Sequence, residues 1–249
     1  MQAITIKGLP VHRILLKLSG EVLAGERHFG YDPQAVQRFA AEIGDIVKLG
    51  LQVGVVLGGG NIWRGNMGPY MERCNADCMG MLATIMNGLA LQDALSRSGV
   101  PARVQTSIPI AKIAEYFVRA KAVRHMEKGR VVIFAGGTGN PYFTTDTAAS
   151  LRALEINADM VIKATKVDGV YDADPVKHPE AKRFERLTYQ ETLQRGLKVM
   201  DASAISMCMD NKLPIVVFDI VTPGNLLRLC RGENLGTIVI DESLMDGAD

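Results

Sequence analysis

Short apolar runs that end in glycine or in a polar turn recur along this chain, and they constrain its fold more than any other sequence feature. The clearest are residues 13–18, 51–57, 130–135 and 160–164, and the first three lead into a Ser-Gly pair, a triple glycine and a double glycine. Runs of this length, closed by turn residues, are typical of buried strands. Further candidate strands lie at residues 102–105, 215–218 and 237–240.

Segments with helical spacing of apolar residues separate these runs. They cover residues 33–49, 76–97, 113–128, 147–156, 189–195 and 203–211. Buried strands that alternate with helices indicate a parallel sheet covered on both faces. We therefore predict an α/β fold, a three-layer α/β/α sandwich around a central, mainly parallel sheet, preceded by a loose leader that reaches about Val11.

Length and charge exclude several classes of function. A chain of 249 residues can bury one sizeable core, so one domain or two fused lobes are expected. With 28 Lys and Arg against 27 Asp and Glu, the net charge of +1 creates no broad field that would hold nucleic acid or an anionic membrane. We expect neither as a partner, and any bound anion has to be held locally.

The most apolar stretch, residues 79–91, is too short to cross a bilayer core, which needs about twenty residues. It is interrupted by Thr84 and Asn87, and we expect either a subunit contact or a central helix buried within one subunit. No secretory leader is recognisable, and the cysteines lack metal-ligand spacing, so reduced thiols in the cytoplasm and no zinc are expected. These cysteines are Cys74, Cys78, Cys208 and Cys230.

Two loops carry cations at the expected carboxyl ends of strands, where ligands gather in parallel sheets. Lys17 lies near the end of an apolar strand and precedes Ser19 and Gly20. A buried ammonium needs an anionic partner, so this lysine either faces a transferring phosphate or extends from the strand edge into solvent. In the second loop, the glycines at 58–60 leave the backbone free to adopt positive φ near an anion, and Arg64 adds donors suited to phosphate oxygens.

Two later loops also follow predicted strands. Residues 136–147 lead into a helix expected to begin near Thr145 or Asp146, and the free amides of a helix start favour an anion. Thr and Asp are also ordinary N-caps, so a purely structural role stays open there. Residues 163–175 contain two lysines, three aspartates and a tyrosine, which suit phosphates, ribose hydroxyls and a base, or else form a solvated turn.

Neither common nucleotide-binding fingerprint is present. The nearest match to GxxxxGKS or GxxxxGKT is residues 25–30, which are followed by Tyr31 and Asp32, and the chain contains no GxGxxG. A P-loop protein and a protein kinase are therefore excluded. A phosphate site would instead be assembled from several strand-end loops.

Taken in order, KLSGE, GGGNIWRG, GTGNPYFTTD and KATKVDGVYDADP resemble bacterial uridylate kinases of the amino-acid kinase superfamily, and the resemblance spans residues 13–240. TGNPYFTTD and residues 77–91 are close to diagnostic of that branch. The resemblance implies a single amino-acid kinase domain over residues 1–249, in which 1–160 bind UMP and form a dimer and 161–249 bind ATP. It implies transfer of the γ-phosphoryl group of ATP to UMP in pyrimidine nucleotide biosynthesis.

The resemblance also implies roles for individual residues. Asp146 would orient the phosphate-facing Lys17, and Asp201 would support them, so the catalytic set is Lys17, Arg64, Asp146 and Asp201. The ATP-binding set is Lys17, Leu18, Ser19, Gly20, Gly60, Arg64, Lys163, Thr165, Tyr171 and Asp174, with Lys166 also near the phosphates. The UMP-binding set is Gly59, Asp77, Thr138, Gly139, Asn140, Pro141, Tyr142, Phe143, Thr144 and Thr145.

No covalent nucleophile or general base is required, because an ionised UMP phosphate oxygen can attack directly. Mg²⁺ is expected to bridge ATP phosphate oxygens without a direct protein ligand. The family is commonly a hexamer of dimers, activated by GTP and inhibited by UTP. Asp93, Arg103 and Arg130 match its GTP-linked positions, although Gln92 and Ser96 replace the Arg and His often found beside them, and residues 66–76 differ from the relatives in length.

Two other functions remain open. One is a kinase of the same superfamily that acts on a carboxylate or a carbamate, and it would lack the GTGNPYFTT loop. The other is a non-catalytic nucleotide-binding regulator, which would lack Lys17, Arg64 or Asp146. All three residues and the loop are present.

Overall fold

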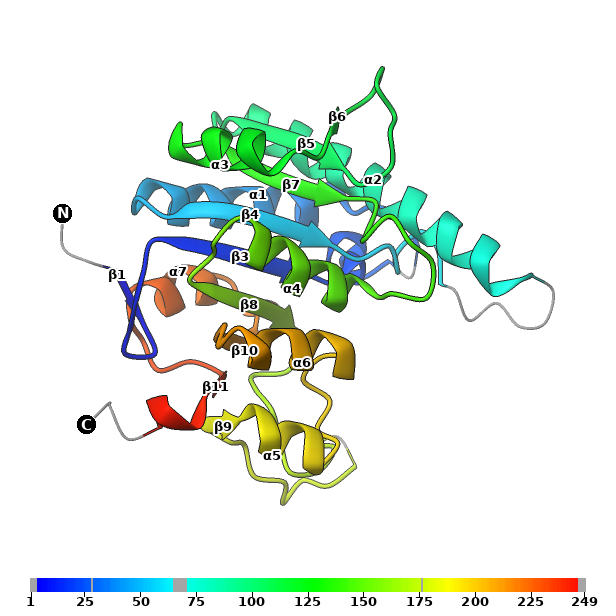
Figure 1. Ribbon diagram of the computed structural model, residues 1–249. Helices are drawn as coiled ribbons and strands as arrows, with labels where there is room; N and C mark the ends of the chain where they lie inside the picture. Colours follow the sequence, from blue (N-terminus) through cyan, green and yellow to red (C-terminus); the bar gives the residue numbers. More distant parts are fainter. Residues whose placement is uncertain (1–3, 28, 65–70, 176, 246–249) are drawn as a thin grey trace.

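A nine-stranded sheet forms the middle layer of the computed structural model, which describes residues 4–27, 29–64, 71–175 and 177–245 (Figure 1). Neighbouring strands are parallel except for the one antiparallel pair that β10 and β11 form. The order across the sheet is β6 (Glu115–Tyr116), β5 (Ala102–Thr106), β7 (Val131–Ala135), β4 (Gln52–Leu57), β3 (Arg13–Leu18), β8 (Met160–Thr165), β10 (Ile215–Asp219), β11 (Thr237–Ile240) and β9 (Arg186–Thr188).

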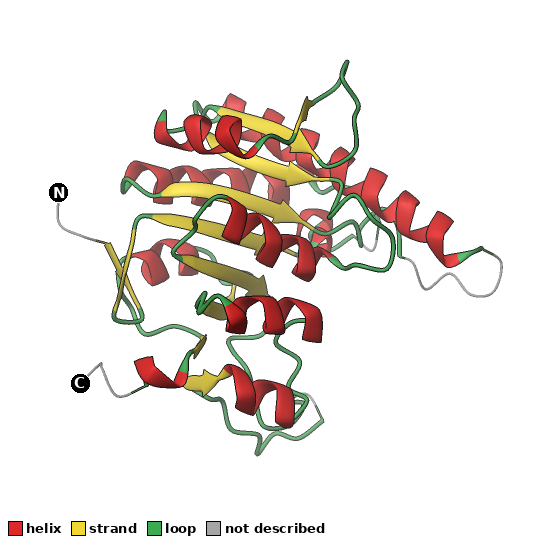
Figure 2. Ribbon diagram, in the orientation of Figure 1, coloured by secondary structure: helices red, strands yellow, loops and turns green. Residues whose placement is uncertain are grey.

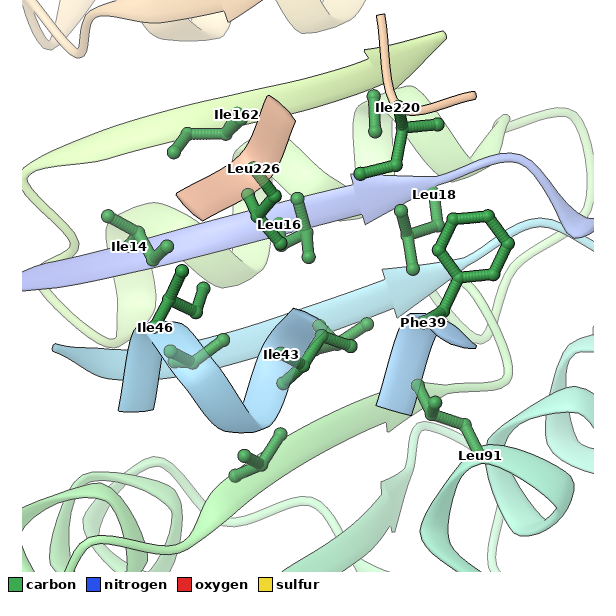
Figure 3. Packing of buried hydrophobic residues seen from close by; sticks show 14 of the residues in the cluster. Ile14, Leu16, Leu18, Phe39, Ile43, Ile46, Leu91, Ile162, Ile220 and Leu226 are labelled. Atoms are coloured by element: carbon green, nitrogen blue, oxygen red, sulfur yellow. The ribbon is translucent and has the colours of Figure 1, made fainter. Parts of the chain in front are cut away.

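Helices cover both faces of the sheet (Figure 2). One outer layer consists of α1 (Pro33–Lys48), α2 (Arg73–Arg97) and α7 (Asn225–Cys230), and the other of α3 (Arg119–Glu127), α4 (Thr145–Glu155), α5 (Tyr189–Gln194) and α6 (Ala202–Asp210). Alternate residues of β3 divide between the two cores: Leu16 belongs to the cluster that also contains Phe39 and Leu226 (Figure 3), whereas Leu15 packs on the side of α4. The predicted α/β/α sandwich is confirmed.

The leader that was expected to be loose is a hairpin. β1 (Ile4–Ile6) and β2 (Leu9–Val11) pair antiparallel, and Ile6 and Val11 are buried. The turn between them is made by Lys7 and Gly8, both at positive φ. The Lys side chain donates to the carbonyl of Gly236 at 2.8 Å, which fixes the hairpin against the loop before β11.

The single helix predicted over residues 113–128 is also wrong. Glu115 and Tyr116 instead extend the sheet beside β5 as β6, and α3 begins only at Arg119. Glu115 accepts a hydrogen bond from Gln105 on β5 at 3.1 Å, which favours the extended backbone over another helical turn. The acidic tail at 246–249 lies outside the described residues.

The carboxyl ends of β3, β4, β7 and β8 point the same way, and α2 extends beyond that edge of the sheet (Figure 1). All four glycine-rich or polar loops singled out in the sequence start at this edge of the sheet. Gly65, in the second of these loops, lies outside the described residues. Within the described ranges, no helix is long and apolar enough to cross a membrane.

Candidate active site

Two lysines on neighbouring strands share one carboxylate at the start of a helix. Lys17 on β3 and Lys163 on β8 are register partners, so their side chains leave the sheet on the same face. On this face α4 begins at a cap formed by Thr144, whose hydroxyl accepts from the N–H groups of Asp146 and Thr147. The carboxylate of Asp146 lies 2.6 Å from Lys17 Nζ through Oδ1 and 2.8 Å from Lys163 Nζ through Oδ2.

Water screens the ion pairs of this cluster only weakly, because the side chains of Lys17, Asp146 and Lys163 are only 11, 14 and 16% exposed. Burial would raise the pKa of Asp146, but the ammonium groups of Lys17 and then Lys163 outweigh it and lower that pKa below its ordinary value. Burial lowers the pKa of Lys163, and the nearby Lys17 adds to this effect while Asp146 opposes it. Asp146 is therefore an ionised carboxylate that holds both lysines at the carboxyl edge.

Asp201 ties the starts of two helices together. It is the N-cap of α6 and accepts from the N–H of Ala204 at 2.8 Å. It also accepts hydrogen bonds from the hydroxyls of Thr144 and Thr147 at the start of α4. Its negative charge favours the protonated form of Lys163. These contacts are those of a residue that fixes α4, and with it Asp146, against α6.

Glu21, to which sequence analysis assigned no role, joins cations from two different loops. It follows β3, the strand between β4 and β8. Its carboxylate lies 3.0 Å from Arg64 Nη2 in the loop after β4 and 3.4 Å from Lys166 Nζ in the loop after β8. Arg64 Nε also donates to the carbonyl of Gly60 at 3.2 Å. These exposed pairs are individually weak, but together they gather two cations over the middle of the carboxyl edge.

The turn after β3 is short and tightly packed. Leu18 is buried at the end of the strand. Ser19 caps the 3-10 helix η1 (Gly20–Ala24), and its hydroxyl accepts from the N–H of Glu21 at 3.4 Å. A Cβ on Gly20 would lie 2.4 Å from the carbonyl oxygen of Gly58, so only glycine lets the loops after β3 and β4 approach this closely.

Close packing, rather than a special backbone conformation, requires a glycine at position 59 in the loop after β4. None of the glycines at 58–60 has a positive φ, so the positive-φ conformation expected from the sequence is wrong for this loop. A Cβ on Gly59 would lie 2.9 Å from the Cβ of Ala83 and 2.9 Å from a backbone carbonyl oxygen of α2. The loop therefore touches α2 directly, and any side chain at this position would push the two apart.

Two polar residues that interrupt the apolar stretch of α2 hold the loops in place. Thr84 Oγ1 accepts from the N–H of Gly136 at 2.8 Å. Asn87 donates to the carbonyl of Gly58 at 2.6 Å and exchanges hydrogen bonds with Asn61 at 2.7 and 3.0 Å. In the sequence, both stand out only as polar interruptions of an apolar stretch. A polar side chain at a buried helix position needs a partner, and that requirement was the available signal.

A cavity of about 160 Å³ opens between α2 and the loop after β7. Met81 belongs to the wall formed by α2, and Trp63 contributes to another wall. Gly139, Pro141 and Tyr142 belong to the same loop but do not line the cavity. Of the residues that the resemblance links with UMP, those that line it are Gly59, Asp77, Thr138, Asn140, Phe143, Thr144 and Thr145.

A second cavity, of about 430 Å³, lies between the loop after β8 and the connection of α5 to α6, and Tyr171 and Asp174 line it. The hydroxyl of Tyr171 donates to Asp168 Oδ1 at 2.6 Å, which fixes the ring and raises the pKa of Tyr171. Thr165 is not part of this wall. It ends β8 and binds the backbone of Val167 through its hydroxyl.

The sequence carries a family signature over most of its length. Residues 12–219 match the model of the amino acid kinase family. The chain belongs to the amino acid kinase family.

Solved structures of kinases resemble this family member over nearly its whole length. A UMP kinase from Bacillus anthracis is 39% identical, with a TM-score of 0.91 and a match that covers 94% of this chain and 98% of that one. A UMP kinase from Ureaplasma parvum is 38% identical, with a TM-score of 0.87 and coverages of 94% and 100%. A uridylate kinase from Archaeoglobus fulgidus is 29% identical, with a TM-score of 0.70 and coverages of 91% and 99%. The predicted kinship with uridylate kinases is confirmed, and with it the prediction of an enzyme.

Within this amino acid kinase, the residues matched to GTP-linked positions have partners in the chain. Arg103 Nε on β5 is 3.9 Å from Glu115 Oε1, and Arg130 Nη1 is 3.0 Å from His125 Nδ1. His125 Nε2 is in turn 3.2 Å from Glu115 Oε2, so both arginines belong to one polar network. Asp93 forms an exposed ion pair with an arginine one turn later on α2.

Proposed function

We propose that this protein transfers the γ-phosphoryl group of ATP to UMP, giving ADP and UDP. The observation that carries the proposal is the buried carboxylate of Asp146, which holds Lys17 and Lys163 beside the cavity lined by Thr138 and Thr145. The likeness to two bacterial UMP kinases at 38 and 39% identity supports UMP as the acceptor.

The proposed chemistry needs alignment and charge compensation rather than a covalent intermediate. An ionised UMP phosphate oxygen attacks the γ-phosphorus of ATP as the bond from that phosphorus to the ADP oxygen breaks. In the direct transfer that we propose, Lys17 donates to the oxygens on which negative charge develops. Asp146 and Asp201 act through other groups, Asp146 by holding Lys17 and Asp201 by fixing the start of α4.

The two cavities support a UMP-binding part in the first 160 residues and an ATP-binding part in the residues that follow. Among the described residues, those that line the cavity proposed for UMP all lie before 160, and those that line the cavity proposed for the adenosine of ATP all lie after 161. Because β3 separates β4 from β8 in the sheet, the loop after β3 lies between the two sides. We propose that the ATP phosphates reach across it, near Lys17, Arg64 and Lys166.

ATP is expected to carry Mg²⁺, which neutralises phosphate charge in reactions of this class. The donors of this site fit a metal held chiefly by phosphate oxygens and water. Both oxygens of Asp146 face ammonium groups, and those of Glu21 face Arg64 and Lys166. No group of three or more potential metal ligands occurs in the described part of the chain.

We also propose regulation by nucleotides. Inhibition by UTP follows from its overlap with UMP in the acceptor cavity. Activation by GTP is supported by the positions of Asp93, Arg103 and Arg130, and GTP would have to compete there with the internal partners of both arginines.

The exposed side of α2 supports a dimer contact, from which a hexamer could be built. Met79, Leu82 and Met86 are 38, 50 and 50% exposed and lie on the side away from the buried residues.

We predict that Leu82→Asp raises the dimer dissociation constant roughly tenfold or more, because it places a charge in an apolar contact. Sedimentation velocity at several concentrations measures this shift. Leu244→Asp, at another exposed leucine, is the control, and equal behaviour of both variants would contradict the contact.

A coupled assay for ADP release tests the activity itself, with UMP, CMP, carbamate and glutamate supplied in parallel. Activity confined to UMP is the expected result. Activity with carbamate or glutamate alone would favour the related kinases, and no ADP release with any acceptor would favour a non-catalytic regulator.

A further inference from the structure

One face of α2 borders the acceptor cavity for about two turns, from Ala76 to Thr84. Arg73, Asp77 and Thr84 are spaced by four and seven residues, which places them on one side of the helix. Asp77 and Thr84 line the cavity. Arg73 stands one turn before Asp77, at the outer end of the same side of the helix.

The loop after β7 is attached to this face at two points. At its base, the N–H of Gly136 donates to Thr84 Oγ1 at 2.8 Å. At its tip, the N–H of Tyr142 donates to Asp77 Oδ2 at 2.8 Å. The loop residues that line the cavity lie between these two hydrogen bonds or just after the second one. The two hydrogen bonds therefore set the distance between the loop and α2.

The tip is held in an unfavourable backbone conformation. Tyr142 has a φ of 71°, a left-handed value that residues with a side chain seldom adopt. The residue is 59% exposed, so packing in the core does not impose this conformation. In the described part of the chain, Tyr142 is contacted by the Asp77 carboxylate at its N–H, by the Cys74 thiol 3.6 Å from its hydroxyl, and by the Arg73 guanidinium 4.6 Å from the ring centroid.

Arg73 is poorly placed for the dipole of its own helix, although it pairs with Asp77 one turn later. It is the first residue of α2, where the helix dipole disfavours a cation. Its guanidinium instead lies over the Tyr142 ring, and its Nε is 3.7 Å from Asp77 Oδ2, the oxygen that accepts from the Tyr142 N–H. One side chain thus contacts both partners of the hydrogen bond at the loop tip.

We propose that Arg73 is a positioning residue for the acceptor nucleotide, which acts by holding the Tyr142 tip against Asp77. This inference rests on the proposed function. Removing the guanidinium frees the strained tip, so the walls of the acceptor cavity lose their fixed separation. Binding of the acceptor nucleotide should therefore weaken. ATP binding and the chemical step should not change, because the lysine cluster and the cavity beside Tyr171 are built from other elements.

The test measures steady-state kinetics of ADP release for Arg73→Leu, with UMP and ATP varied in turn, and UMP binding by calorimetry. KM and Kd for UMP are expected to rise about fivefold, the order of magnitude of one cation–π contact, while KM for ATP and kcat stay near the wild-type values. Arg73→Lys, which keeps a cation, is expected to recover most of the loss. Arg97→Leu is the matched control, because Arg97 is also 65% exposed and also pairs with an aspartate on α2.

A double-mutant cycle separates positioning from general destabilisation. Tyr142→Leu is expected to raise KM for UMP as Arg73→Leu does, and the combined variant no further than either. The inference is overturned if Arg73→Leu and Arg97→Leu have the same KM for UMP, if KM for ATP rises equally, or if the two effects add fully. A wild-type protein that releases no ADP with UMP would overturn the proposed function, and this inference with it, before any variant is compared.

Discussion

Lys17→Ala is expected to lower kcat for UMP phosphorylation by roughly a hundredfold or more, which is the usual effect of removing one preorganised donor from a transition state. The Lys17 ammonium is buried and held 2.6 Å from an ionised carboxylate, so it needs little reorganisation to meet developing charge. The fold should persist, because Asp146 keeps Lys163 as a partner at 2.8 Å. Coupled ADP release at saturating UMP and ATP measures the loss.

Two further variants make the Lys17 result interpretable. Lys17→Met keeps the apolar stem of the side chain, so a loss equal to that of Lys17→Ala assigns the effect to the charge rather than to packing. Lys48→Ala removes a lysine that is 75% exposed on α1 and should leave kcat unchanged. A kcat for Lys17→Ala close to that of the wild type, with an unchanged circular dichroism spectrum, would remove Lys17 from the mechanism.

The central strands could be predicted because burial on both faces produces uninterrupted apolar runs. The runs at 13–18 and 237–240 coincide with β3 and β11. The edge of the sheet escaped prediction, since β6 has two residues and β9 has three, too few for any periodicity to be visible. The hairpin of β1 and β2 was missed for the same reason, and because its Lys-Gly turn lacks the Asn-Gly or Asp-Gly signal.

The candidate site could be predicted as a set of loops but only partly as a set of contacts. Lys17 and Lys163 could be singled out because each is a cation near the end of an apolar strand. That they share one carboxylate depends on the register of β3 with β8, which no local sequence pattern specifies. Likewise, Glu21 meets Arg64 and Lys166 only because β3 lies between their strands. The roles of such residues follow from strand order, and strand order follows from the whole sheet.

Asp146→Asn is expected to impair both activity and stability. Asparagine keeps the shape of the side chain but leaves two buried ammonium groups without a counter-ion. Removing one partner of a buried ion pair typically lowers the free energy of unfolding by about 3 to 5 kcal/mol, and Asp146 is only 14% exposed. Turnover should fall as well, because Lys17 loses the carboxylate that orients it. Asp45→Asn, in an exposed pair on α1, is the control.

The stability loss in Asp146→Asn should depend on pH in a direction fixed by the charges. In the wild type the pKa of Asp146 is lowered on folding, so its stabilising contribution is complete above the unfolded value of about 3.9 and disappears as pH falls through the folded value. In the variant, Lys163 loses Asp146 and keeps only the weaker pKa-raising effect of Asp201, so its pKa falls further below its unfolded value. The unfolded state then binds more protons than the folded state on the alkaline side, and the variant gains stability as pH rises. Urea unfolding should therefore show the largest difference from the wild type near neutral pH and a smaller one near pH 10, whereas an equal difference at both would mean that the lysines are not the cause.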